Sequence, residues 1–322
     1  MRHRTTTAFR ALPVLFLLAG SAVAEDDTAR SSQWIDIYFG EPVAYETMLW
    51  DLVEEADVIY LGEFHTLDRH HAMQTKIVSD LAKQDVSLVL GIEQMEADRQ
   101  PALDRYYRGE IDFDQLAEQT EWADRWNGYE QYRSILEATR AHGGQILALN
   151  ARKETIRQVA RSGGVDGLDA EMRKELPAEM QLEDPLYAKL LDLQMMVHMS
   201  VSSERLRPIR EAQIARDEMM ASVLCSFLQS PEGKGRTAVV ICGAGHVSYG
   251  LGMPDRVRRR MPHLKQRIVL ISESGDVELS DAQKAAMREI TITHEQIREI
   301  NRPIADYLHV TSLKSDDDSQ ED

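Results

Sequence analysis

Three apolar segments of this chain each end in side chains that can do acid–base or metal chemistry. Two carboxylates and two histidines of this kind can bind a divalent metal that activates water, with a carboxylate as general base. Without a metal, a histidine held by a carboxylate can act as a base, or the four side chains can form the polar floor of a ligand site. The simpler alternative is that each is a strand-end polar group, hydrogen-bonded to nearby backbone amides. The segments are 58–61 before Gly62-Glu63-Phe64-His65, 88–92 before Glu93, and 238–242 before Gly243-Ala244-Gly245-His246.

Each of these segments is predicted to be a strand of a parallel sheet. A run of apolar residues that includes β-branched or aromatic side chains is typical of a strand buried on both faces. A helix is predicted over 68–83, between the first two strands, because its apolar residues recur at helical spacing. Such a β-α-β crossover makes the two strands parallel, and ligands bind at the carboxyl ends of parallel strands. We therefore expect the four side chains to lie at one rim of the sheet.

The predicted fold class is α/β, with a mainly parallel central sheet flanked by helices and an all-helical cap insert. The strand signal is absent over about 171–229, which is where we place the insert. Insertions in such folds come from the loops that line the site, so the insert is expected to cover the rim. Residues 25–40 are expected to form an irregular arm. The predicted strands are 57–61, 87–92, 145–149, 236–242 and 266–271, with an edge strand over 305–310.

The insert carries candidate ligand-binding residues. His198 lies within Met195-Met196-Val197-His198-Met199, and thioethers around a histidine can ligate haem or copper. The alternative is a helix that buries its methionines as gap-filling core residues. Arg216 and Asp217 are expected to point toward the rim, although neighbours on a helix cannot both face it squarely.

Residues 1–24 are predicted to be a secretory signal peptide. Three arginines form a basic start, a short apolar region follows, and Ala22-Val23-Ala24 is a small-x-small cleavage site. Cleavage there, with no lipobox cysteine, predicts a periplasmic or secreted protein. The mature chain is then expected to form a single α/β domain over 25–312, followed by an acidic disordered tail over 313–322.

The strongly negative net charge of the chain argues against nucleic acid and anionic lipid as binding partners. The formal net charge is −17, and it becomes −20 once the three arginines of the signal peptide, which contains no acidic residue, are removed. A chain this acidic repels nucleic acid and anionic lipid, so no nucleic-acid partner is expected. No other stretch is long and apolar enough to be a transmembrane segment. Cys225 and Cys242 can pair in an exported protein, but two buried thiols are the simpler interpretation.

Several short motifs spread along the chain belong together. They are Leu61-Gly62-Glu63-Phe64-His65, Gly91-Ile92-Glu93, Trp126 with Tyr129, Ala148-Leu149-Asn150, Gln213 with Arg216-Asp217-Glu218-Met219, Gly243-Ala244-Gly245-His246, and Gly252-Met253-Pro254. With them the chain resembles the ChaN-like family of bacterial haem-binding envelope proteins, from about residue 34 to 311. That family sits in a wider group with the TIKI/TraB proteins and the erythromycin esterases. The resemblance implies an α/β core with a helical cap, and haem binding linked to iron uptake.

The leading interpretation is therefore an exported protein that binds haem non-covalently at the carboxyl ends of the strands under the cap. The chain has no Cys-x-x-Cys-His signal for covalent attachment. An acquisition site must release its cargo, which a single oxygen or nitrogen ligand permits better than a closed pair of ligands. Tyr249 and His198 are the candidate iron ligands, and Arg216 and Asp217 are further candidate binding residues. The sequence leaves a homodimer open.

The rival interpretation is a metal-dependent hydrolase of peptide or ester bonds. Relatives in the wider group are hydrolases, some of them metal-dependent, that use the strand-end Glu and His residues. On this interpretation Glu63, His65 and His246 would bind a divalent transition metal, and Glu93 would complete the catalytic set.

Overall fold

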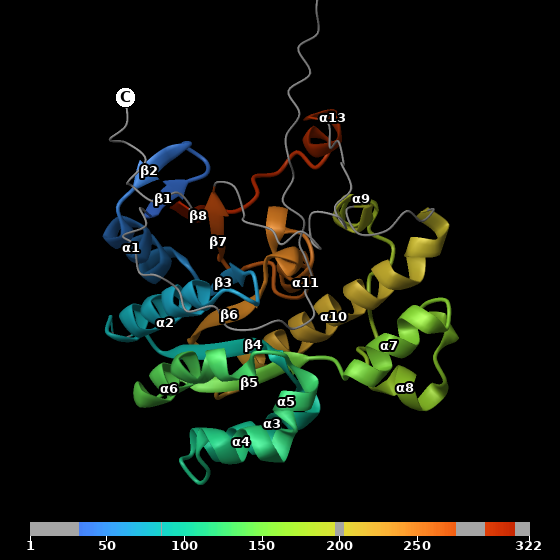
Figure 1. Ribbon diagram of the computed structural model, residues 1–322, viewed down its shortest axis with the longest axis horizontal. Helices are drawn as coiled ribbons and strands as arrows, with labels where there is room; N and C mark the ends of the chain where they lie inside the picture. Colours follow the sequence, from blue (N-terminus) through green and yellow to red (C-terminus); the bar gives the residue numbers. More distant parts are fainter. Residues whose placement is uncertain (1–31, 85, 197–202, 275–293, 313–322) are drawn as a thin grey trace, which may run out of the picture.

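The computed structural model describes residues 32–84, 86–196, 203–274 and 294–312, and within them the chain forms one mixed α/β sheet structure. Eight strands of these residues pair in the order β2-β1-β8-β7-β3-β6-β4-β5 (Figure 1). The six strands from β8 to β5 are parallel, and β1 and β2 add an antiparallel ribbon at one edge. The strands are β1 (Ser32–Asp36), β2 (Glu41–Val43), β3 (Val58–Glu63), β4 (Leu88–Glu96), β5 (Gln145–Asn150), β6 (Thr237–Gly243), β7 (Gln266–Ser274) and β8 (Tyr307–Ser312).

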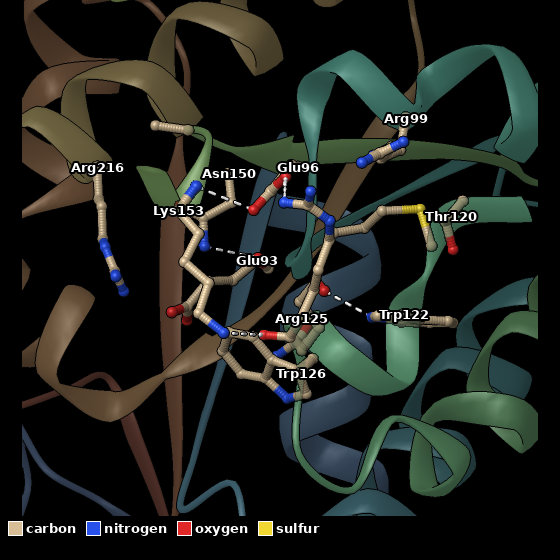
Figure 2. Close-up of a pocket in the computed structure, with 13 residues that line it drawn as sticks. Glu93, Glu96, Arg99, Thr120, Trp122, Arg125, Trp126, Asn150, Lys153 and Arg216 are labelled. Atoms are coloured by element: carbon tan, nitrogen blue, oxygen red, sulfur yellow. Dashed lines mark hydrogen bonds and ion pairs between the residues drawn. The ribbon is translucent and has the colours of Figure 1, made fainter. Parts of the chain in front are cut away.

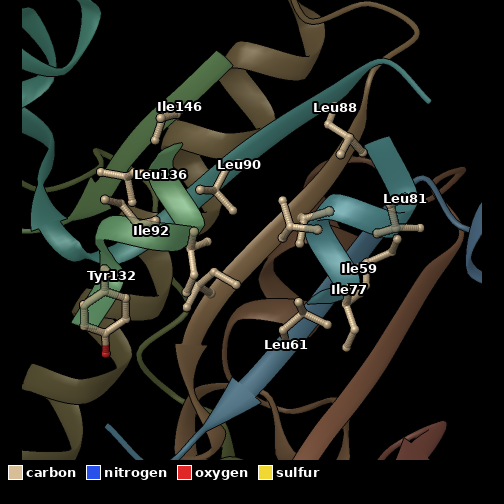
Figure 3. Packing of buried hydrophobic residues seen from close by; sticks show 14 of the residues in the cluster. Ile59, Leu61, Ile77, Leu81, Leu88, Leu90, Ile92, Tyr132, Leu136 and Ile146 are labelled. Carbon is tan, nitrogen blue, oxygen red and sulfur yellow. The ribbon is translucent and has the colours of Figure 1, made fainter. Parts of the chain in front are cut away.

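Helices cover both faces of this sheet. On one face Ile59 and Leu61 of β3 pack with Ile77 and Leu81 of the following helix, as Figure 3 shows. On the other face Val58 and Tyr60 belong to a second core. Successive residues of a strand point to opposite faces, so an unbroken apolar run is what a strand covered on both sides requires.

Many of the described helices contribute to one of these two cores, while α7 and α9 contribute to two smaller apolar clusters. Residues of α1, α2, α3, α4 and α6 contribute to the first, and residues of α10 and α11 to the second. Their bounds are α1 (Tyr45–Glu55), α2 (Asp68–Ala82), α3 (Gln100–Tyr107), α4 (Phe113–Thr120), α5 (Trp122–Arg125), α6 (Arg133–Ala141), α7 (Lys153–Arg161), α8 (Ala170–Lys174), α9 (Pro185–Met196), α10 (Ser203–Gln229), α11 (Met253–Arg260) and α13 (His294–Arg298).

The predicted parallel centre is confirmed, and the strand predicted over 305–310 is present as β8, but the irregular arm and the edge position of that strand were wrong. The expected irregular arm contains β1, whose single buried residue, Trp34, gives too weak a pattern to identify a strand. Because β1 pairs with β8, β8 is an internal strand and not the expected edge. Strand β4 also continues to Glu96, so Glu93 lies within the strand, next to a register shift against β5.

The all-helical cap is not confirmed. Over the insert the chain forms helices, but the second half of α10 packs Met220, Leu224 and Leu228 into the second core. This half of α10 is therefore the ordinary crossover helix between β5 and β6. Its apolar residues have the same spacing as a cap helix would have, so the pattern does not say which surface they cover.

Three predictions lie outside the described residues: the signal peptide over 1–24, the haem-ligand candidate His198 and the acidic tail over 313–322. Within the described residues, none of the helices has both the length and the apolar character that a membrane span needs. Cys225 and Cys242 are both buried and free.

Gly62 tests the close packing where β3 meets the segment after β6. A Cβ on Gly62 would stand 2.5 Å from Leu270 Cδ2 and 3.1 Å from Val247 Cγ2. We expect Gly62→Ala to lower the free energy of unfolding by about 1–3 kcal/mol, since overpacking forces neighbours apart. A Cβ on Gly245 would meet only Gln194 Oε1, at 3.8 Å, so Gly245→Ala is the matched control and should be nearly neutral. Urea unfolding of both variants measures this, and equal midpoints would contradict the packing argument.

Candidate active site at the strand ends

Glu63 is a buried carboxylate at the end of β3. Its Oε1 accepts hydrogen bonds from His65 Nδ1 at 2.8 Å, from the Tyr132 hydroxyl at 2.5 Å and from Gln94 Nε2 at 3.1 Å. His71 Nδ1 lies 3.1 Å from Oε2. Burial by itself would raise the pKa of Glu63, but the hydrogen bonds from the two histidines lower it to about 2. Glu63 is therefore ionised at neutral pH.

His65 links the buried carboxylate of Glu63 to the solvent-exposed surface of the site. Its side chain is 24% exposed, whereas that of Glu63 is fully buried. Burial lowers the pKa of His65, but the hydrogen bond to Glu63 and the nearby Glu93 carboxylate outweigh it, and the net shift is upward. The edge of Trp126 packs against the ring, with centroids 5.0 Å apart. A partly exposed histidine oriented by a buried carboxylate is the arrangement of a general base with its orienting group.

A second buried group of charged side chains, the ion group, lies at the end of β6 and is formed by His246, Glu93 and Asp217. His246 Nε2 lies 3.1 Å from Glu93 Oε1, and His246 Nδ1 lies 2.7 Å from Asp217 Oδ1. The backbone N–H of Gly243 donates to Glu93 Oε2 at 2.8 Å, and the Tyr187 hydroxyl donates to Asp217 Oδ2 at 2.7 Å. Burial would lower the pKa of His246, but the two carboxylates raise it to about 10. His246 is thus a buried cation between two carboxylates.

Gly243 brings the two groups together. A Cβ built there would stand 2.8 Å from His65 Nε2 and 3.7 Å from Glu93 Oε2. The absence of a side chain therefore lets the His65 ring approach the Glu93 carboxylate. The structure accordingly groups all four predicted side chains where β3, β6 and β4 lie side by side, with Glu93 inside β4 and the other three at or just beyond the ends of β3 and β6. We call Glu63, His65, Glu93 and His246 the strand-end site. Their catalytic and metal-binding roles stay predictions.

Metal binding is not supported by the arrangement of these donors. In the described ranges of the chain, no group of three or more His, Cys, Asp or Glu side chains is arranged to hold a metal ion. The donors of the strand-end site instead point at one another, as the contacts between His65 and Glu63 and between His246 and Glu93 show.

Arg216 and Asp217 diverge as expected of neighbours on a helix. Asp217 is buried in the ion group, whereas Arg216 lines a cavity of about 80 Å³, which we call the strand-end cavity. Figure 2 draws this cavity, with Arg216 standing apart from the paired side chains around Arg125. The other lining residues are Glu93, Gln94, Met95, Glu96, Arg99, Thr120, Trp122, Arg125, Trp126, Asn150, Ala151 and Lys153.

Tyr249 does not join the strand-end site, although it follows His246 by three residues. It lines a separate, open hollow of about 210 Å³, which we call the Tyr249 hollow. Its backbone is left-handed, with φ 61° and ψ 15°. The hollow is also lined by Tyr38, Gly250, Pro254, Arg258, Gln266, Ile268, Arg302, Pro303, Ala305 and Asp306.

The partners that hold the site differ in how far the sequence indicates them. The sequence places His71 near this rim, because it lies in the first turn of the helix after β3. Tyr132 follows Trp122, Trp126 and Tyr129, and such a dense group of aromatic residues is as typical of helix packing as of a pocket wall. Tyr187 had no signal, since nothing in its helix distinguishes a tyrosine that reaches Asp217 from one that fills the core.

A family model described as haem-binding uptake, Tiki superfamily, ChaN matches residues 49–257. The chain belongs to this ChaN family. The family description names haem-binding uptake, so haem is the ligand that membership supports. The predicted resemblance is confirmed.

Three known proteins are similar to this chain, and the first of them shares its fold. ChaN of Campylobacter jejuni, in a structure described as cofacial haem binding, has 18% identity and a TM-score of 0.63, covering 88% of this chain and 97% of that one. An erythromycin esterase variant in its open conformation has 11% identity and a TM-score of 0.41, covering 74% of this chain and 77% of that one. Protein RETICULATA-RELATED 5, chloroplastic, of Arabidopsis thaliana is 24% identical over 302 residues, which are 85% of this chain. This chain covers 37% of that plant protein.

His246 tests whether its buried charge stabilises the ChaN fold here. His246→Gln removes the cation between two buried carboxylates, so we expect a loss of about 3–5 kcal/mol in the free energy of unfolding at pH 7. The pKa of His246 is raised in the folded chain, from 6.5 to about 10. Its contribution is therefore complete below pH 6.5 and disappears as the pH rises through 10. The difference in urea midpoint between wild type and variant should shrink from pH 7 to above pH 10, and a constant difference would rule out a charged His246.

Proposed function

We propose that this chain is an exported haem-binding protein that takes up haem non-covalently in the Tyr249 hollow. Membership of the ChaN family supports haem as the ligand. The strand-end cavity, expected from the sequence to hold it, has a volume of only about 80 Å³. Pockets that enclose drug-sized ligands measure roughly 300–1,000 Å³, so neither this cavity nor the Tyr249 hollow, at about 210 Å³, encloses a whole porphyrin. An open hollow can instead cover part of a haem and leave the rest at the surface.

Tyr249 is the observation that carries the proposed location. A bulky residue with a left-handed backbone is uncommon, and such strain costs on the order of 1–3 kcal/mol. Its backbone N–H donates to Ile304 O at 2.8 Å, which helps to hold this conformation. Glycine would adopt the same backbone conformation without strain. A tyrosine at this position therefore indicates a role for its phenol side chain. Strain of this kind concentrates at functional sites.

The chemistry of the hollow suits haem. A tyrosine oxygen is an established type of haem-iron ligand, and bound haem would supply an iron centre open to such a ligand. Burial raises the pKa of Tyr249, so its hydroxyl is protonated in the free chain at neutral pH. The guanidinium groups of Arg258 and Arg302 can pair with the propionate carboxylates of haem. The propionates would compete for them with Asp255, their present partner.

Exposed aromatic residues add an apolar surface beside the hollow. Tyr38 is 67% exposed and lines the hollow, and the neighbouring Phe39 is 78% exposed. A porphyrin packs favourably on such aromatic faces. A hollow that covers one porphyrin face also suits the cofacial mode of haem binding described for the Campylobacter protein.

Haem titration tests the proposed ligand. Tyr249→Phe keeps the ring and removes the oxygen, so we expect at least about ten-fold weaker haem binding and a changed Soret spectrum. Tyr107→Phe is the matched control, since the Tyr107 hydroxyl bonds only to Gly143 O at 3.4 Å among the described residues. Unchanged spectrum and affinity in Tyr249→Phe would contradict the proposal. His198→Ala, measured in parallel, would then decide whether the second candidate is the ligand.

Export is the other part of the proposal. It is supported by the basic start, short apolar region and cleavage site of residues 1–24. Mass spectrometry of the protein purified from the periplasm or medium should give a mature chain that begins at Glu25. Recovery of the chain with residues 1–24 still attached would contradict cleavage at this site.

A further inference from the structure

The strand-end cavity contains a cation without an acidic partner. In the part of the chain that the structure describes, Arg216 makes no hydrogen bond and has no carboxylate within ion-pair distance. This is not for lack of acids, because the chain has 54 Asp and Glu against 37 Lys and Arg. The carboxylates that line the cavity are already paired, Glu93 with His246 and Glu96 with Arg125 at 2.6 Å. Lys153 Nζ donates to the carbonyl oxygens of Asp124 and Arg125, so Arg216 is the cation of this cavity that has neither an acidic partner nor a hydrogen bond among the described residues.

Two buried acceptors in the same wall also lack donors. Gln94 and Asn150 are 2% and 6% exposed, and within the described chain Gln94 Oε1 and Asn150 Oδ1 have no hydrogen-bond partner. Their orientations are fixed by their other ends, because Gln94 Nε2 donates to Glu63 Oε1 and Asn150 Nδ2 donates to Glu93 O. Flipping either amide would set oxygen against oxygen. Burying an acceptor without a donor is costly, so these two oxygens call for a donor from outside the protein.

We propose that the strand-end cavity binds a small α-hydroxy carboxylate. The carboxylate would pair with the guanidinium of Arg216, and the hydroxyl would donate to Gln94 Oε1 or Asn150 Oδ1. A volume of about 80 Å³ accommodates a molecule of this size and not a porphyrin. The proposal does not depend on haem binding, since the Tyr249 hollow shares no lining residue with this cavity.

Three matched ligands test the required groups in the wild-type mature protein. Glycolate has both the carboxylate and the hydroxyl, acetate lacks the hydroxyl, and glycolamide lacks the charge. Calorimetric titration at constant ionic strength, carried into the tens of millimolar, should show saturable binding of glycolate. Acetate and glycolamide should each bind at least about ten-fold more weakly. Absence of saturable glycolate binding, or equal binding of all three, would overturn the proposal.

Two variants test the assigned cation. Arg216→Gln should weaken glycolate binding at least about ten-fold, while Arg157→Gln, which changes an exposed arginine of α7, should bind like wild type. Haem affinity should be unchanged in Arg216→Gln, which separates this site from the proposed haem site. Wild-type glycolate affinity in Arg216→Gln would overturn the assignment. The ligand series in wild type decides the proposal even if this variant does not fold.

Discussion

The structure depends on keeping two carboxylates ionised in its interior. Glu63 and Glu93 are 2% and 1% exposed, and burying an unpaired carboxylate would cost several kcal/mol. Each is neutralised by groups from other elements: His71 of α2 for Glu63, and His246 beyond β6 for Glu93. The end of β3 is thereby joined to helix α2. Strand β4 is joined to the segment that follows β6, which is the strand between β3 and β4. The polar groups thus fix the relative positions of elements that apolar packing alone would leave free to slide.

Site residues that follow an unbroken apolar run were predictable from the sequence. The side chains from other elements that pair with them were not. Glu63 and His246 could be found because a parallel sheet buried on both faces forces its strands to be continuously apolar. Asp217 was named as a candidate for the rim, but its pairing with His246 is a contact between a helix and a strand end far apart in sequence. Tyr132 and Tyr187 share that difficulty. The cap prediction was not confirmed for a similar reason. The spacing of apolar residues predicts a helix such as α10, but it does not predict which surface the apolar side of that helix covers.

Two neighbouring polar residues of α10, Arg216 and Asp217, have different surroundings. Successive residues on a helix differ by about 100° in direction, so Asp217 faces the buried ion group while Arg216 reaches the cavity wall. Asp217 helps to hold the charge of His246, which in turn holds Glu93. Replacing Asp217 would therefore disturb the ion group itself, whereas replacing Arg216 removes a charge that nothing in the described chain compensates. This difference makes Arg216 the informative position for ligand binding.

Size separates the two hollows of the molecule. The strand-end cavity lies among buried, mutually paired charges, and its volume of about 80 Å³ restricts it to a few atoms. The Tyr249 hollow is open, larger at about 210 Å³, and bordered by exposed aromatic and guanidinium groups. A large planar ligand with two carboxylates therefore matches the second, because it can be covered on one face and remain accessible for transfer. If haem occupies the Tyr249 hollow as proposed, the strand-end cavity, which Glu93 of the strand-end site lines, is left for a ligand much smaller than haem.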